Sequence, residues 1–175
     1  GGFMLAAHSA LYAFYSLYLS RLGYSSVTIG LMWAVGAIAE IVFFIYQAPI
    51  VQRFGIRMIM LASLFLAVVR FALIGVAAQS LVVLLFAQLL HAATFGAHHV
   101  TSILSIQKWF AGPLQARGQA LFISASYGIG GTLGGFLLSC VWDRYTPAMV
   151  YIVASGWALL ALAAAWLSFC WQERK

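Results

Sequence analysis

Long apolar stretches separated by short polar gaps dominate this sequence. Each stretch approaches the length of a membrane-spanning helix, which needs about 20 mostly apolar residues. We predict six spans, and their ranges are 3–20, 28–48, 58–77, 80–103, 118–140 and 148–170. The expected connections are residues 21–26, 49–57, 78–79, 107–117 and 142–147. None of them is long enough for an inserted soluble domain, so residues 1–175 are predicted to form a single all-α membrane domain.

The composition excludes a soluble protein. Hydrophobic residues make up 65% of the chain, against about 45–50% in soluble domains, and charged residues make up 7% against about 25%. This small number of charged residues cannot cover the surface of a soluble domain. Membrane lipid is therefore the expected partner. The net charge of +6 is spread over the short gaps, which is typical of membrane-protein loops, and we expect no nucleic-acid partner.

The distribution of Lys and Arg predicts the orientation. The side that carries the first residue also carries six of these residues, namely Arg53, Arg57, Lys108, Arg117, Arg174 and Lys175. The opposite side carries only Arg21 and Arg144. The positive-inside rule therefore places both ends of this segment in the cytoplasm. Because Gly1 and Gly2 lead directly into apolar sequence without a polar flank, we expect further chain upstream.

Two charged residues fall near the middle of predicted spans. Glu40 lies in the second span and Arg70 in the third. Each costs at least about 2.5 kcal/mol at a helix centre, so such residues face a cavity or a partner. Glu40 and Arg70 could form a structural pair that joins two helices, or they could serve proton coupling. A pair that breaks when the acid is protonated would do both.

One face of the fourth span is polar. It carries Gln88, His91, Thr94, His98, Thr101 and Ser105, which recur at three- and four-residue steps. Such a face should contact protein or water rather than lipid. His91 lies near the middle of the span, and imidazole titrates near neutral pH and can relay protons. The alternative is hydrogen bonding between helices. His99 points away from this face.

The first two spans also carry faces suited to a pocket. His8, Tyr12 and Tyr15 share a face of the first span, and Trp33 shares a face of the second span with Glu40. Aromatic rings with hydroxyl groups suit a pocket for an organic substrate. They suit ordinary helix packing equally well, so both interpretations stay open.

Glycines are concentrated in the fifth span. Gly130 and Gly134 form one GxxxG pair, and Gly131 and Gly135 form a second, overlapping pair. Positions without a side chain let another helix approach closely, so we expect a packing role for them.

Particular stretches resemble the major facilitator superfamily. Residues 52–57 read Gln-Arg-Phe-Gly-Ile-Arg, which resembles the Asp-Arg-x-Gly-Arg-Arg signature of that superfamily, with Gln52 in place of Asp and Ile56 in place of Arg. The finer resemblance is to the phenylpropionate permease group, a relative of the lactose and nucleoside proton symporters. It is carried by residues 8–12, 23–25, 30–33 and 88–91, together with Glu40 and Arg70.

This resemblance implies that the chain is the C-terminal half, helices 7–12, of a twelve-helix transporter whose N-terminal half is its partner. Lactose-permease relatives use an acid on helix 8, an Arg on helix 9 and a His on helix 10 in proton coupling, and Glu40, Arg70 and His91 fall on those helices. The acid that these relatives carry one turn after the histidine is absent here, where Thr94 and Phe95 stand.

The implied function is proton-coupled symport of a small organic solute by alternating access in a bacterial inner membrane. An aromatic carboxylate such as 3-phenylpropionate is the expected solute. The candidate substrate-binding residues are Arg70, His8, Tyr12, Tyr15, Trp33, Gln88 and His98.

Other functions remain as alternatives. A sugar or nucleoside proton symporter would fit the same pattern. A six-helix channel is weaker, because the sequence carries no selectivity-filter loop or ring of like charge. A membrane haem or metal protein is also weaker, because His91 and His98 are seven residues apart and acidic ligands are scarce. We therefore expect no cofactor, no metal and no enzymatic activity.

Overall fold

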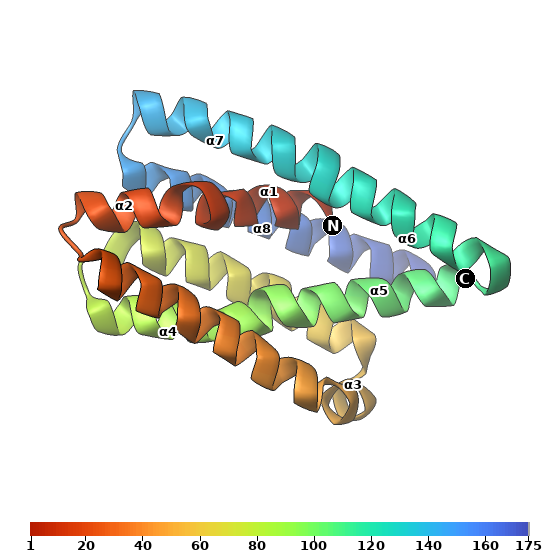
Figure 1. The fold of residues 1–175 in the computed structure, drawn as a ribbon. Coiled ribbons are helices and arrows are strands. Elements are labelled where there is room, and N and C mark those ends of the chain that lie inside the picture. Colours follow the sequence, from red (N-terminus) through yellow and green to blue (C-terminus); the bar gives the residue numbers. More distant parts are fainter. Residues whose placement is uncertain (175) are drawn as a thin grey trace.

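The computed structural model describes residues 1–174, and this part of the chain is helical without a strand. Within these residues the helices form six rods, which run side by side (Figure 1). The first rod consists of α1 (Gly2–Ser9), the π-helical η1 (Ala10–Phe14) and α2 (Tyr15–Arg21). The second and third rods are the two parts of α3 (Ser26–Ala77). The others comprise α4 (Leu81–His91), η2 (Ala92–Gly96) and α5 (Ala97–Trp109); η3 (Gly112–Leu114), α6 (Gln115–Ile123), η4 (Ser124–Gly131) and α7 (Thr132–Arg144); and α8 (Pro147–Gln172).

Short turns with clear local causes separate the rods. Gly23 turns the chain with a positive φ of 88°, a conformation that glycine adopts without steric cost. Ser25 and Ser80 then cap α3 and α4, since each hydroxyl accepts a hydrogen bond from a backbone N–H of the first helical turn. Pro147 occupies the first position of α8, where its missing N–H costs nothing.

The predicted connection over residues 49–57 is wrong in extent. The helix continues through Pro49, and the chain reverses at Gly55, which has φ 76° and ψ 158°. Glycine is the residue that tolerates this conformation, so the reversal occurs there rather than at the proline. Figure 1 shows α3 running outward, reversing and returning behind α4.

Among residues 1–174, four helical stretches are long and apolar enough to cross a membrane, namely Ser26–Ala77, Leu81–Trp109, Gly112–Arg144 and Pro147–Gln172. The first of these contains both parts of α3. The rod over residues 2–21 is about 30 Å long at 1.5 Å per residue, which also matches the hydrocarbon thickness. Each predicted span lies within a helical rod, except that the fourth begins at Ser80, the residue that caps α4; the membrane boundaries stay a prediction. Lys175, one of the basic residues used for the orientation, lies outside the described residues.

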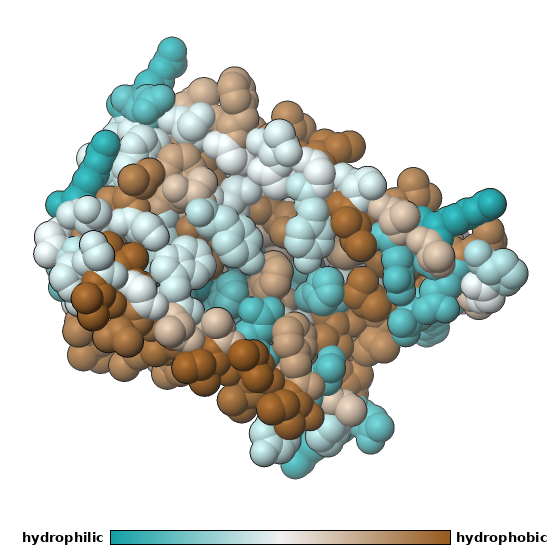
Figure 2. All heavy atoms as spheres, viewed as in Figure 1, coloured by the Kyte–Doolittle hydropathy of each residue, from teal (hydrophilic) through white to brown (hydrophobic). Residues whose placement is uncertain are grey.

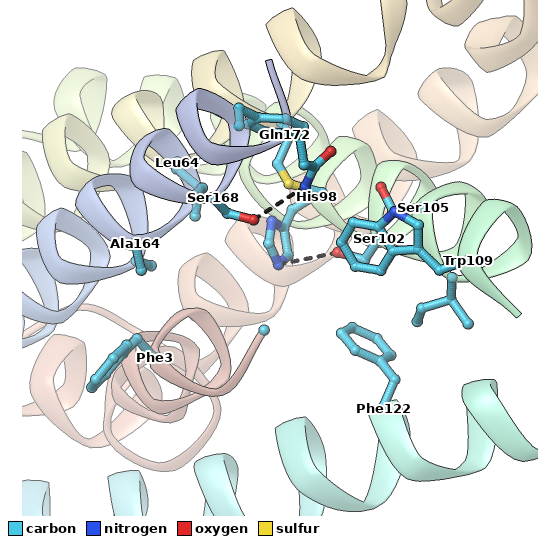
Figure 3. Close-up of a pocket in the computed structure, with 16 residues that line it drawn as sticks. Phe3, Leu64, His98, Ser102, Ser105, Trp109, Phe122, Ala164, Ser168 and Gln172 are labelled. Atoms are coloured by element: carbon cyan, nitrogen blue, oxygen red, sulfur yellow. Dashed lines mark hydrogen bonds between the residues drawn. The ribbon is translucent and has the colours of Figure 1, made fainter. Parts of the chain in front are cut away.

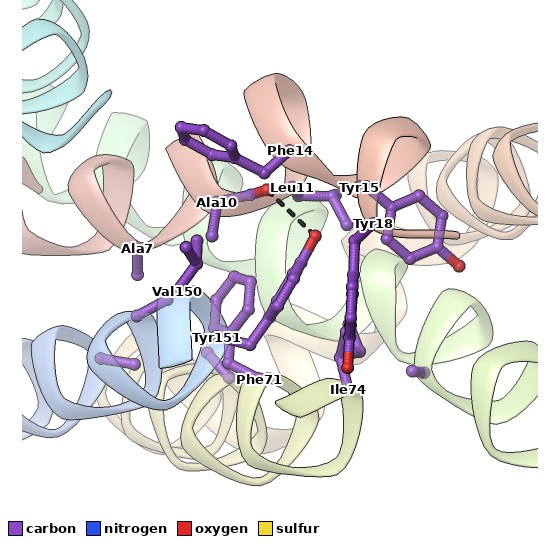
Figure 4. Packing of buried hydrophobic residues seen from close by; sticks show 14 of the residues in the cluster. Ala7, Ala10, Leu11, Phe14, Tyr15, Tyr18, Phe71, Ile74, Val150 and Tyr151 are labelled. Carbon is purple, nitrogen blue, oxygen red and sulfur yellow. Dashed lines mark hydrogen bonds between the residues drawn. The ribbon is translucent and has the colours of Figure 1, made fainter. Parts of the chain in front are cut away.

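The apolar core joins the first rod to α3 and α8. Tyr18 and Tyr151 stack with ring centroids 5.2 Å apart, and the Tyr151 hydroxyl donates a hydrogen bond to the Ala10 carbonyl at 3.3 Å. Figure 4 shows these two rings side by side, and Phe14 and Phe71 belong to the same buried cluster. The face of the molecule seen in Figure 1 is shown with all its atoms in Figure 2. Intermediate and hydrophilic residues, in white and teal, run along the centre of this face, and hydrophobic residues, in brown, lie along its borders.

Candidate functional site

Arg70 is the anchor of a polar network inside the bundle. Its side chain projects from the returning part of α3 and is completely buried, with 0% of its surface exposed. Its Nε donates to the Ala87 carbonyl at 2.7 Å, and one terminal nitrogen donates to His91 Nδ1 at 3.0 Å and to Thr94 Oγ1 at 3.1 Å. The other terminal nitrogen lies 3.4 Å from Gln88 Oε1. Arg70 therefore ties α3 to α4 and η2.

His91 links Arg70 to Glu40. A guanidinium group can only donate hydrogen bonds, so His91 Nδ1 must be the acceptor and the neutral ring carries its proton on Nε2. That Nε2 lies 3.5 Å from Glu40 Oε2. The side chain of Glu40 is 20% exposed, whereas Arg70 is sealed inside. The network thus runs from a buried cation, through an oriented imidazole, to an accessible carboxylate.

A direct pair between Glu40 and Arg70 was one of the alternatives that the sequence left open. Within residues 1–174 the two side chains form no ion pair, and His91 lies between them. The physical reason is that Arg70 already has acceptors on α4 and η2 that satisfy its donors. Glu40, on the outgoing part of α3, instead meets the outer edge of the imidazole.

Two glycines bring these helices close together. A Cβ added at Gly96 would lie 3.5 Å from Glu40 Cγ and 3.2 Å from the Phe43 ring. A Cβ added at Gly36 would lie 2.9 Å from Gln88 Oε1. At Gly96 a side chain would press on the Phe43 ring, so this glycine lets η2 lie close to α3. At Gly36 a side chain would press on the end of Gln88, so this glycine leaves room for the Gln88 side chain of α4. This role is not visible in the sequence without knowing which helices are neighbours.

The polar face of the fourth predicted span does contact protein, as expected. Gln88, His91, Thr94, His98 and Thr101 are buried, and Ser105 is half-buried. The hydroxyl groups mostly bond carbonyls of their own helix, as in Thr101 to Ala97 at 2.8 Å and Ser105 to Thr101 at 2.7 Å. The hydrogen bonds that cross between helices are those of Arg70 with Gln88, His91 and Thr94. The functional candidates on this face are therefore concentrated between Gln88 and Thr94.

The candidates of the first rod divide into two groups. His8 and Tyr15 are fully buried, and His8 donates from Nδ1 to the Met4 carbonyl at 3.0 Å, while its Nε2 has no hydrogen-bond partner within residues 1–174. Tyr12 is 52% exposed and stacks on Trp33 with an interplanar angle of 12°. Tyr12 and Trp33 therefore form an open aromatic wall, whereas His8 and Tyr15 belong to the interior.

His98 lies apart from the Arg70 network. It lines a separate cavity of about 280 Å³ together with Ser102, Ser105 and Phe122 (Figure 3). Its Nε2 lies 3.5 Å from the Ser102 hydroxyl, and its Nδ1 has no partner among the described residues. No hydrogen bond in residues 1–174 connects it to Arg70.

Three residues near the network were missed as site candidates. Phe95 stacks on His91 with ring centroids 5.3 Å apart and an interplanar angle of 3°, and on His99 at 6.3 Å and 14°. His99 Nδ1 lies 3.0 Å from the Tyr127 hydroxyl of η4. The four-residue spacing of His91, Phe95 and His99 was the available signal. Within residues 1–174, no three His, Cys, Asp or Glu side chains are grouped as a metal site would need.

Comparisons with known proteins identify the family. Residues 2–153 match the MFS_1 like family. The "Probable 3-phenylpropionic acid transporter" of Escherichia coli (strain K12) is 31% identical over 134 residues, which cover 75% of this chain and 35% of that protein. The nucleoside permease NupG of the same organism is 22% identical over 145 residues, covering 81% of this chain and 35% of NupG. The chain thus spans about a third of the length of these curated relatives.

A solved structure shows the same fold. The crystal structure of the nucleoside transporter NupG superposes with a TM-score of 0.74 at 20% identity, over 97% of this chain and 42% of that chain. The rods, the apolar surface and these matches agree with the predicted fold class. The chain belongs to the MFS_1-like family of the major facilitator superfamily and is an all-α membrane protein with the fold of one six-helix half of such a transporter.

Proposed function

We propose that this chain is the C-terminal half of a proton-coupled symporter that imports a small aromatic carboxylate by alternating access. Its partner would be an N-terminal six-helix half, and its place a bacterial inner membrane with both ends of this segment in the cytoplasm. Support for the substrate class comes from the relative named as a 3-phenylpropionic acid transporter. Support for a missing half comes from the 35% coverage of that relative.

The observation that carries the proposal is the chain of contacts from Arg70 through His91 to Glu40. Because Arg70 occupies His91 Nδ1 and the Nε2 proton faces Glu40, His91 cannot accept a further proton without losing its bond to Arg70. Glu40 is the accessible acid of the network and is therefore the proton carrier. His91 and Arg70 orient and stabilise its charged form.

Protonation of Glu40 would be coupled to helix movement through this contact. The 3.5 Å contact between Glu40 Oε2 and His91 Nε2 joins the outgoing part of α3 to α4, and it is electrostatically favourable when Glu40 is ionised and the N–H of the imidazole faces it. Neutralising Glu40 removes most of that attraction, while Arg70 still holds the returning part of α3 against α4. The outgoing part of α3 can then separate from its neighbours, as alternating access requires.

The aromatic wall of Tyr12 and Trp33 is the proposed contact surface for the substrate ring. Arg70 is enclosed in this conformation, so it binds a substrate carboxylate only after a rearrangement. That enclosure favours a second candidate, a neutral substrate such as a nucleoside or sugar, for which Arg70 need not become accessible. The relative named as the nucleoside permease NupG supports a nucleoside as that alternative.

Replacement of Glu40 by Gln in the intact transporter tests the proposal. In proteoliposomes, uptake of labelled 3-phenylpropionate driven by a pH gradient should fall by at least about tenfold, because the proton carrier is lost. Exchange of labelled for unlabelled substrate at equal pH should persist, since it needs no net proton movement. Asp143→Asn is the matched control, because it removes an exposed carboxylate at the end of α7. Undiminished gradient-driven uptake in Glu40→Gln would refute the assignment.

A further inference from the structure

A groove lies between the returning part of α3 and α8, on the outer surface of the bundle. It is open to the outside, with a volume of about 990 Å³, and every residue that lines it is apolar except Arg57. Ala62 and Ala163 lie among larger side chains such as Phe65 and Trp166, and their small size makes the surface concave. None of the groove residues belongs to the network of Arg70, His91 and Glu40.

Arg57 occupies one end of the groove and is held in position. It follows the reversal at Gly55 by two residues, and it forms an ion pair with Glu173 near the end of α8. Its guanidinium lies 5.8 Å from the Trp166 ring centroid and 5.9 Å from that of Phe169. The side chain remains 39% exposed, and a guanidinium has five N–H donors. Donors therefore remain for an anion at the mouth of the groove.

The groove is somewhat shorter than the hydrocarbon region of one membrane leaflet. At 1.5 Å per residue, the lining stretch from Leu159 to Leu167 of α8 rises about 12 Å, and that from Met58 to Phe65 of α3 rises about 10 Å. Half of the hydrocarbon core is about 15 Å thick. A ligand in the groove would thus lie along the membrane normal, with its polar end at Arg57.

We infer that this groove is a binding site for an anionic phospholipid, with one acyl chain between α3 and α8 and the phosphate group on Arg57. A molecule with an apolar body and an anionic end matches an apolar wall that ends in a single cation. Basic residues at the membrane surface attract anionic lipids in this way. A second copy of the chain is a poorer occupant, because a symmetric contact through the groove would bring two Arg57 side chains into the same interface.

Lipid retention by the purified, intact transporter tests the inference. Native mass spectrometry would count dioleoyl-phosphatidylglycerol and dioleoyl-phosphatidylcholine bound in neutral detergent. Arg57→Gln should weaken phosphatidylglycerol binding by about fivefold or more, without changing phosphatidylcholine binding. Arg117→Gln, which removes an exposed charge on α6, should leave both lipids unaffected.

Glu173→Gln separates lipid binding from the ion pair. This variant frees Arg57, so phosphatidylglycerol binding should be retained or strengthened. An equal loss in Arg57→Gln and Glu173→Gln would mean that Arg57 acts only through its ion pair, and the inference would be wrong. Ala163→Phe fills the groove and should reduce retention of phosphatidylglycerol, because the acyl chain is displaced. Unchanged retention in that variant would also overturn the inference.

Discussion

Gly134 is the position where the addition of one methyl group should be most informative. A Cβ added there would lie 2.5 Å from the Ala6 Cα, 2.8 Å from the Ala6 Cβ and 3.0 Å from the Ala6 carbonyl oxygen. Carbon atoms in contact are normally about 3.5–4.0 Å apart. The obstacle is backbone, which no side-chain rotation can remove. In Gly134→Ala, α7 must therefore move away from α1 by about 1 Å.

Two effects of opposite sign determine the outcome. Forcing an extra carbon into a packed interface typically costs about 1–3 kcal/mol. Replacing glycine by alanine within a helix contributes up to about 1 kcal/mol of stability. We therefore expect a net loss of up to about 2 kcal/mol in the free energy of unfolding. Gly131→Ala is the matched control, because a Cβ added there meets nothing within 4 Å and only the favourable effect remains.

Unfolding of the intact transporter in mixed micelles, titrated with a denaturing detergent, would measure the difference. The two variants should differ by about 1–3 kcal/mol, with Gly134→Ala the less stable. Equal shifts in the two variants would show that α1 and α7 are not in backbone contact. That result would remove the packing role assigned to the pair formed by Gly130 and Gly134.

Two further substitutions test individual contacts. Arg70→Lys keeps the charge but cannot bond His91, Thr94 and a backbone carbonyl together. Gradient-driven uptake should therefore fall by at least about tenfold, and uptake at the wild-type rate would show that the charge alone suffices. Tyr24→Phe removes hydrogen bonds to the Ala78 and Gln79 carbonyls at 3.0 and 2.8 Å. It should lower the free energy of unfolding by about 1 kcal/mol and leave uptake unchanged; an unaltered unfolding curve would contradict this.

The helical organisation followed from the sequence because lipid imposes a simple rule. A span must be apolar over its whole length, so the six spans were visible as runs. The buried face of the fourth span was equally readable, since polar residues at helical spacing must avoid lipid. The connection was predicted to begin at Pro49, but the helix continues through that residue, because the position of the reversal depends on backbone conformation and Gly55 supplies that conformation.

The candidate site was only partly predictable. Glu40, Arg70 and His91 stood out because charge and imidazole are rare inside a membrane. Which of these three side chains contacts which did not follow from the sequence, because it depends on the acceptors that surround Arg70 in the fold. His98 was grouped with them by helical periodicity, yet it lines another cavity. Periodicity gives the face of a helix but not its neighbours, and those are decided by small contacts such as that at Gly96.

The partners of Arg70 also bear on how the protein is made. All four of its hydrogen-bond acceptors lie within residues 87–94, on the helix that directly follows its own, across a turn of only a few residues. A lone arginine in a nascent span costs about 2.5–3.5 kcal/mol at insertion. That cost is offset as soon as the next helix leaves the ribosome and pairs with it. The two spans therefore have a physical reason to enter the bilayer together, as one hairpin.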